Sequence, residues 1–137
     1  MPLPKRVLID DSAFLALLSA DDTNHHIAVQ HYGRLIDRSQ ELWVTSSVLI
    51  RITNWVYSRF GIEGVCIFKD STEEIIHTFW IDGTTYQNAL ELMENTPTRS
   101  TLELEESLVS VASSYLQAYV FTFNNCFSEL GIPVIPR

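Results

Sequence analysis

The sequence predicts an α/β fold in a single domain over residues 1–137, with a parallel sheet of about five strands between two layers of helices. Short apolar runs alternate along the chain with segments whose apolar side chains recur at helical spacing. Strands separated by helices need crossover connections, which make the sheet parallel and cover both of its faces. The chain of 137 residues fits one compact domain and contains no internal repeat or low-complexity stretch.

The first half of the chain supplies two strands and three helices. They are expected, in order, as strand 6–10, helix 13–18, helix 24–38, strand 42–45 and helix 47–60. Ser12 caps the first helix, and the polar stretch before Ile27 caps the second. Ser46 or Ser47 opens the third helix, which ends at Gly61 because glycine is common just after a helix.

The second half continues the alternation of strands and helices. Its expected elements are helix 70–76, strand 77–81, helix 84–93, helix 102–116, strand 119–123, helix 126–130 and a strand near 134–135. Thr84 or Thr85 caps the first long helix of this half. Residues 95–100 contain proline and small polar residues, a composition typical of a loop.

The charge composition limits the classes of partner. Nine Lys and Arg stand against seventeen Asp and Glu, a formal net charge of −8. This balance disfavours broad adsorption to a phosphate backbone, so any contact with RNA must be local. It is equally compatible with a basic protein partner. No apolar run is long enough to span a bilayer and the N-terminus lacks a signal-peptide core, so we expect a cytoplasmic protein without membrane association.

Acidic residues fall where a sheet of this kind binds ligands, outside the carboxyl ends of its strands. Asp10 ends the first strand and Asn124 follows the fourth, while Glu103, Glu105 and Glu106 lie where the preceding helix begins. Carboxylates from separate segments are what Mg²⁺ or Mn²⁺ needs to orient and activate water for phosphodiester hydrolysis. Acids at a helix N-terminus also favour the helix dipole, so spacing alone leaves a purely structural role open.

Four motifs occur in a characteristic order: VLIDDSA at 7–13, VTSSVLIRITN at 44–54, LEESL at 104–108 and VFTFNNCF at 120–127. Together they resemble the PIN domains, small metal-dependent ribonucleases that include the toxins of bacterial toxin–antitoxin pairs. The resemblance implies a metal site at Asp10, Arg51, Glu106 and Asn124. Arg51 stands where the family has glutamate, and Asn124 replaces an aspartate. Cys126 falls where a second aspartate or a histidine often stands.

The departures from the family pattern predict weakened or lost catalysis. The guanidinium of Arg51 stays protonated, and we expect it to pair with Asp10 or Glu106 where the family holds its metal. Asn124 offers a neutral amide, a weaker ligand than a carboxylate. Asp11 follows Asp10 directly, so it is expected to point elsewhere or to cap the first helix.

Three functions stay open. The first is a PIN-like protein with weakened or lost catalysis, without a cofactor, that retains binding to RNA or to a partner protein. The second is an active Mg²⁺- or Mn²⁺-dependent endoribonuclease of single-stranded RNA, in which Asp10 and Glu106 hold the metal with help from Glu103 or Glu105. The third is a protein-interaction module whose acidic surface holds a basic, antitoxin-like partner.

The resemblance also implies self-association, because PIN-family proteins commonly form dimers. We therefore expect a homodimer. Trp55 and Tyr57, on the third predicted helix, are candidates for its surface.

Overall fold

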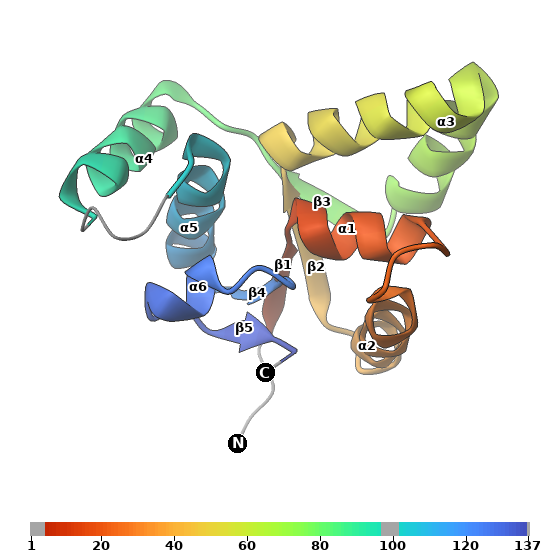
Figure 1. Cartoon of the computed structure of the whole chain (residues 1–137), viewed down its shortest axis with the longest axis horizontal. Coiled ribbons are helices and arrows are strands. Elements are labelled where there is room, and N and C mark those ends of the chain that lie inside the picture. Colours follow the sequence, from red (N-terminus) through yellow and green to blue (C-terminus); the bar gives the residue numbers. More distant parts are fainter. Residues whose placement is uncertain (1–4, 97–101, 137) are drawn as a thin grey trace.

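Five parallel strands form the central sheet, in the order β3-β2-β1-β4-β5 (Figure 1). The computed structural model describes residues 5–96 and 102–136. The strands are β1 (Arg6–Ile9), β2 (Glu41–Thr45), β3 (Ile76–Phe79), β4 (Tyr119–Phe121) and β5 (Val134–Ile135). Each pairing between neighbouring strands is parallel. The predicted α/β class and parallel five-stranded sheet are confirmed.

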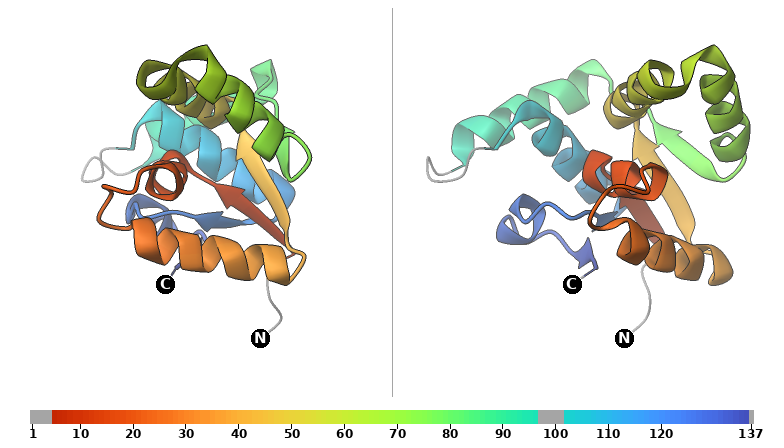
Figure 2. Two further views of the ribbon diagram at one scale, coloured as in Figure 1. Left: turned by 90° about the vertical axis from the view of Figure 1, so that its right-hand side faces the viewer. Right: turned by 45° about the vertical axis from the view of Figure 1, so that its right-hand side comes forward.

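Helices cover both faces of this sheet. They are α1 (Asp11–Leu18), α2 (His25–Asp37), α3 (Ser46–Thr72), α4 (Gly83–Asn95), α5 (Leu104–Leu116) and α6 (Cys126–Glu129). The first three lie on one side of the sheet and the last three on the other (Figure 1 and Figure 2). None of the described helices is long and apolar enough to cross a membrane.

The core forms where the two helical layers meet the sheet. Val7, Leu8 and Ile9 of β1 are fully buried, because β1 is the middle strand and both of its faces are covered. Ile52 of α3 and Val109 of α5 are buried in the same hydrophobic cluster. This packing fixes the carboxyl ends of β1 and β4 side by side, as their register shows.

Three helix caps lie slightly upstream of their predicted positions. The caps are Asp10 for α1, Thr45 for α3 and Asp82 for α4, and each side chain accepts a hydrogen bond from a backbone N–H of the first turn. The predicted caps Ser12, Ser46 or Ser47, and Thr84 or Thr85 were therefore wrong. The reason is that a cap keeps extended backbone dihedrals, so the last extended residue before each helix takes this role.

Gly61 interrupts α3 but does not end it. Its φ of 68° and ψ of −166° are not helical, yet the chain resumes a helix and folds back toward the sheet (Figure 1). We call residues 62–72 the returning arm. Phe68 anchors this arm edge-to-face on Phe14, with ring centroids 6.0 Å apart. The separate short helix predicted over 70–76 was wrong, because those residues end the arm and Ile76 already belongs to β3.

The remaining elements lie close to their predicted positions. The helix α5 begins at Leu104 and the strand β5 contains Val134 and Ile135. The helix α4 extends to Asn95, two residues beyond the predicted end. The predicted loop over 95–100 falls mostly outside the described residues.

Candidate functional site

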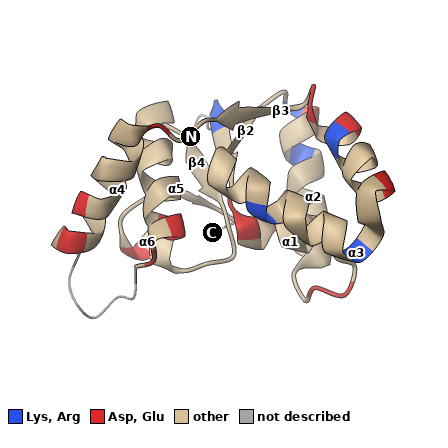
Figure 3. Cartoon of the chain, turned by 90° about the horizontal axis from the view of Figure 1, so that it is seen from above, with Lys and Arg blue, Asp and Glu red and all other residues tan. Residues whose placement is uncertain are grey.

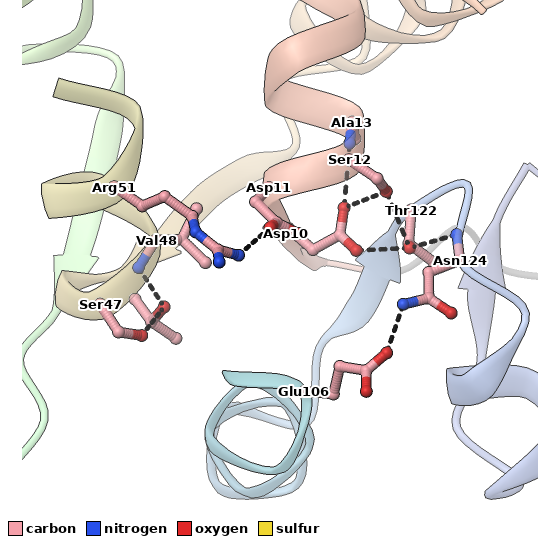
Figure 4. A network of polar contacts seen from close by, with 11 residues as sticks. Asp10, Asp11, Ser12, Ala13, Ser47, Val48, Arg51, Glu106, Thr122 and Asn124 are labelled. Atoms are coloured by element: carbon pink, nitrogen blue, oxygen red, sulfur yellow. Dashed lines mark hydrogen bonds and ion pairs between the residues drawn. The ribbon is translucent and has the colours of Figure 1, made fainter. Parts of the chain in front are cut away.

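The candidate site lies at the carboxyl ends of β1 and β4, beside the start of α5. Figure 4 shows Asp10, Arg51, Glu106 and Asn124 around this edge of the sheet. Asp10 follows β1, Asn124 follows β4 by three residues, and Glu106 lies in the first turn of α5. Arg51 reaches the site from the second turn of α3. The structure therefore brings together the four segments that carry the motifs.

Asp10 is enclosed by protein donors. Its side chain is only 1% exposed. The Oδ1 atom accepts hydrogen bonds from the Ala13 N–H at 3.0 Å and from the Ser12 hydroxyl at 2.8 Å. The Oδ2 atom accepts one from the Thr122 hydroxyl at 2.5 Å. Burial raises the pKa of Asp10 to about 6, although these three hydrogen bonds oppose the rise.

Ser12 and Thr122 extend this network to the loop after β4. The Thr122 hydroxyl accepts a hydrogen bond from the Asn124 N–H at 2.9 Å. The Ser12 hydroxyl accepts one from the Phe123 N–H at 2.9 Å. These two hydroxyls thereby tie the start of α1 to the end of β4. Neither residue was predicted to belong to the site. The signal available in the sequence was that Ser12 lies close to Asp10, and Thr122 close to Asn124, within the motifs.

Glu106 and Asn124 bond directly to each other. The Asn124 side-chain amide donates to Glu106 Oε2, while its own Oδ1 accepts from the Cys126 N–H at 3.0 Å. Glu106 Oε1 accepts from the Glu103 N–H at 3.0 Å, half of a capping box at the start of α5. Burial alone would raise the pKa of Glu106, but hydrogen bonds from Glu103, Cys126 and Asn124 outweigh it and lower the pKa. Glu106 is therefore a charged acceptor.

Cys126 completes this side of the site as a protonated thiol. Burial, together with the hydrogen bond to the Glu106 carboxylate, raises the pKa of the thiol well above its ordinary value. A thiol that stays protonated is a poor nucleophile and a poor metal ligand. Cys126 is therefore a neutral thiol beside Glu106.

Arg51 pairs with Asp11, and the prediction that it pairs with Asp10 or Glu106 was wrong. Its Nη1 lies 2.6 Å from Asp11 Oδ2, and the two side chains are 57% and 27% exposed. The carboxylate of Asp10 is turned inward to cap α1, whereas Asp11 in the first turn faces α3 (Figure 4). An ion pair this exposed contributes at most about 1 kcal/mol to stability.

Glu105 lies beside the Arg51–Asp11 pair. Burial raises the pKa of Glu105 and the nearby Asp11 carboxylate adds to the rise, while the Ser47 hydroxyl and Arg51 oppose it. Its Oε1 atom is buried and has no hydrogen-bond partner among the described residues. Glu105 is thus the acid of this site whose bonding capacity is least used.

A second feature lies on the α1–α3 side of the sheet. The helices α1 and α2 and both arms of α3 enclose an apolar groove of about 650 Å³, which we call the α1–α3 groove. Phe14, Trp55, Phe60 and Ile67 are among its lining residues. Trp55 lies under the guanidinium of Arg59, 5.0 Å from the ring centroid. The groove was not predicted from the sequence, because no helix was expected over most of the returning arm.

Known proteins resemble this chain in fold but not detectably in sequence. No protein-family model and no curated protein matches the sequence. Solved structures do match. The toxin VapC20 of Mycobacterium tuberculosis, which cleaves the sarcin–ricin loop, has a TM-score of 0.75 at 15% identity, covering 92% of this chain and 95% of that chain. The chain has the PIN fold.

Two further solved structures share this fold. FitAcB from Neisseria gonorrhoeae has a TM-score of 0.70 at 11% identity over 93% of this chain and 95% of that chain. VapBC2 from Rickettsia felis, bound to a DNA fragment from its promoter, has a TM-score of 0.68 at 10% identity over 94% and 96%. The PIN-type architecture is therefore retained along most of the chain although few residues are shared.

The residues at this site do not fit the divalent ion that the PIN resemblance implies. Hard divalent ions need several oxygen ligands with a net negative charge. Here the carboxylates of Asp10 and Glu106 are already bonded to protein donors, and Arg51 adds a cation nearby. Within residues 5–96 and 102–136, no three His, Cys, Asp or Glu side chains are grouped so as to hold a metal ion.

Proposed function

We propose that this PIN-fold protein does not cleave RNA through a divalent metal and instead acts by binding a protein partner. The observation that carries the proposal is the hydrogen bond from the Asn124 amide to Glu106. A carboxylate at position 124 would share a metal with Glu106. The amide instead occupies Oε2 of Glu106 with a hydrogen bond and adds no negative charge. Metal binding would have to break this contact first.

Two further features of the site support loss of metal binding. Asp10 would need to give up hydrogen bonds from Ser12, Ala13 or Thr122 before it could turn toward an ion. The guanidinium of Arg51, paired with Asp11, would repel a divalent cation placed nearby. Each change opposes binding independently of the Asn124 contact.

A protein is a better candidate partner than RNA. The net charge of −8 disfavours a polyanion, and the α1–α3 groove is lined mainly by apolar side chains. A groove of about 650 Å³ suits the apolar face of a partner helix. Among the proteins with similar folds, one structure is a toxin–antitoxin complex from Klebsiella pneumoniae, with a TM-score of 0.70 at 11% identity over 96% of this chain and 98% of that chain. We therefore propose an antitoxin-like partner for this chain.

The catalytic half of the proposal is tested by RNA cleavage in the presence of Mn²⁺. The wild-type protein is expected to cleave single-stranded RNA no faster than an Asp10→Asn variant. Calorimetric titration of Mn²⁺ into the wild-type protein should show no saturable binding. Chelator-sensitive cleavage that disappears in Asp10→Asn or Glu106→Gln would establish the active ribonuclease, with Glu105 as the acid we had underrated.

The binding half is tested by co-expressing this chain with the products of the genes that flank its own. Ile67, 68% exposed and lining the α1–α3 groove, is replaced by aspartate. The matched control is Ile50→Asp on the same helix, 59% exposed and not part of the groove lining. Co-purification should be lost in the first variant and kept in the second. No complex with the wild-type chain, or equal behaviour of both variants, would contradict the proposal.

We also propose that the chain forms a homodimer, away from the α1–α3 groove. Trp55 lines the groove, so it is not free for such an interface, whereas Tyr57 of α3 is 58% exposed and does not line the groove. Sedimentation equilibrium of the wild-type chain should give twice the mass of one chain, and Tyr57→Asp should shift it toward the monomer. A wild-type monomer at all accessible concentrations would refute the dimer.

A further inference from the structure

The charge of this protein is divided unevenly along the chain. Residues 1–81, which end before α4, contain seven Lys and Arg and ten Asp and Glu, a formal charge of −3. Residues 82–137 contain two Lys and Arg and seven Asp and Glu, a formal charge of −5. In Figure 3, α4, α5 and α6 carry acidic residues and no Lys or Arg, while basic residues occur on the α1–α3 side. The molecule therefore presents one acidic lobe.

This lobe contains a second groove, separate from the α1–α3 groove and on the other side of the sheet. The helices α4 and α5 and the segment after α6 enclose about 420 Å³, which we call the α4–α5 groove. Aliphatic side chains line it from three elements: Leu92, Val111, Leu130 and Ile132. Exposed polar side chains line it as well: Asn88, Glu91, Asn95 and Ser114.

The polar residues of α4 lie along one side of the α4–α5 groove. Asn88, Glu91 and Asn95 recur every three to four residues, so they form one row along the helix. An asparagine amide offers both donors and acceptors to a peptide backbone, and Glu91 offers a charge to a basic side chain. No hydrogen bond or ion pair within the described residues uses the side chain of Asn88, Glu91 or Asn95.

We propose that the α4–α5 groove binds a short basic segment of a partner protein, with an aliphatic side chain against its floor and Lys or Arg beside Glu91. The acidic lobe would steer such a segment toward this side of the molecule, because α4, α5 and α6 carry acids without Lys or Arg, whereas both signs are mixed on the α1–α3 side. The aliphatic floor selects a peptide over a free polyamine, and the absence of Lys and Arg from α4, α5 and α6 excludes a nucleic acid. This proposal is independent of the one for the α1–α3 groove.

The probe for this surface is a fluorescein-labelled peptide with one leucine between two pairs of arginines. Fluorescence anisotropy with the full chain should show saturable binding that weakens as salt is added. Glu91→Lys should weaken binding by about tenfold, since a close attractive pair becomes a repulsive one. The matched control, Asp37→Lys, reverses the charge of an exposed acid on α2 that lines neither groove and should leave the affinity unchanged. Circular dichroism verifies that both variants fold.

Two altered peptides separate this site from general attraction to an acidic protein. Replacing the leucine by serine should weaken binding severalfold, because it removes the contact with Leu92, Val111, Leu130 and Ile132. Replacing the arginines by glutamates should abolish binding. Absence of saturable binding, an equal loss in the two lysine variants, or undiminished binding of the serine peptide would each overturn the proposal.

Discussion

Replacing Asp10 by asparagine should make this protein more stable at neutral pH. Asp10 is almost fully buried, and burial raises its pKa from 3.8 to about 6. Between these two values the folded chain holds a proton that the unfolded chain has released. The free energy of unfolding therefore falls as the pH rises through this window. The difference between 3.8 and about 6 corresponds to a loss of about 3 kcal/mol.

The asparagine side chain can keep the hydrogen bonds that hold Asp10. Its Oδ1 still accepts from Ser12 and Ala13, and its amide nitrogen faces the Thr122 hydroxyl, which rotates to accept. The Thr122 proton can then be donated to Ser12 Oγ, 3.3 Å away. The pH-dependent cost of Asp10 is thereby removed while the geometry is retained.

The assay is urea unfolding followed by circular dichroism between pH 4 and pH 7. The difference in unfolding free energy between Asp10→Asn and the wild type should grow by about 2.4 kcal/mol in favour of the variant across this range, since part of the total lies below pH 4. Asp37→Asn, an exposed acid in the last turn of α2, serves as the control and should show no such growth. A difference that stays flat, or a wild type that gains on the variant as the pH rises, would refute the reasoning.

Three other substitutions test the fold and the site. Gly61→Ala should lower the free energy of unfolding in urea by about 1–3 kcal/mol, because alanine is strained at φ 68°. Gly33→Ala, inside the regular helix α2, should raise it by about 0.5–1 kcal/mol. Equal effects of the two substitutions would contradict the kink at Gly61. Phe68→Ala should lower the free energy of unfolding by about 3–5 kcal/mol and speed amide hydrogen exchange in the returning arm. Unchanged exchange would mean that Phe68 does not anchor this arm. The melting temperature of the double variant Arg51→Glu, Asn124→Asp should rise when Mn²⁺ is added, whereas that of the wild type should not. No rise in the double variant would mean that other residues prevent metal binding.

The strands were predictable and the returning arm was not, for a physical reason. The apolar runs of β1 and β4 are buried on both faces, so composition alone marks them. In the returning arm Phe68 is buried, while Ile62 and Ile67 are exposed. Phe68 and the partly buried Val65 pack against the core, and the exposed isoleucines between and beside them obscure the helical spacing in the sequence. The position of the arm depends on tertiary packing against α1.

In the candidate site, too, the sequence predicts which segments meet but not how each side chain is paired. The order of the motifs was enough to predict that Asp10, Glu106 and Asn124 would meet. The partner of Arg51 was not predictable, because Asp10 and Asp11 are adjacent and differ only in which of them caps α1. The cap must face the Ala13 N–H, so the next residue is the one that points toward α3.

The place of β1 in the sheet has a consequence for biosynthesis. β1 is made before both of its neighbours, and β4, which completes its second edge, begins only at Tyr119. At about 5–20 residues per second, the ribosome leaves that edge open for seconds. An apolar strand with free N–H and C=O groups invites pairing with another nascent chain on the same messenger. Chains that stop before Tyr119 are therefore expected to be insoluble and to depend on chaperones, however stable the finished protein is.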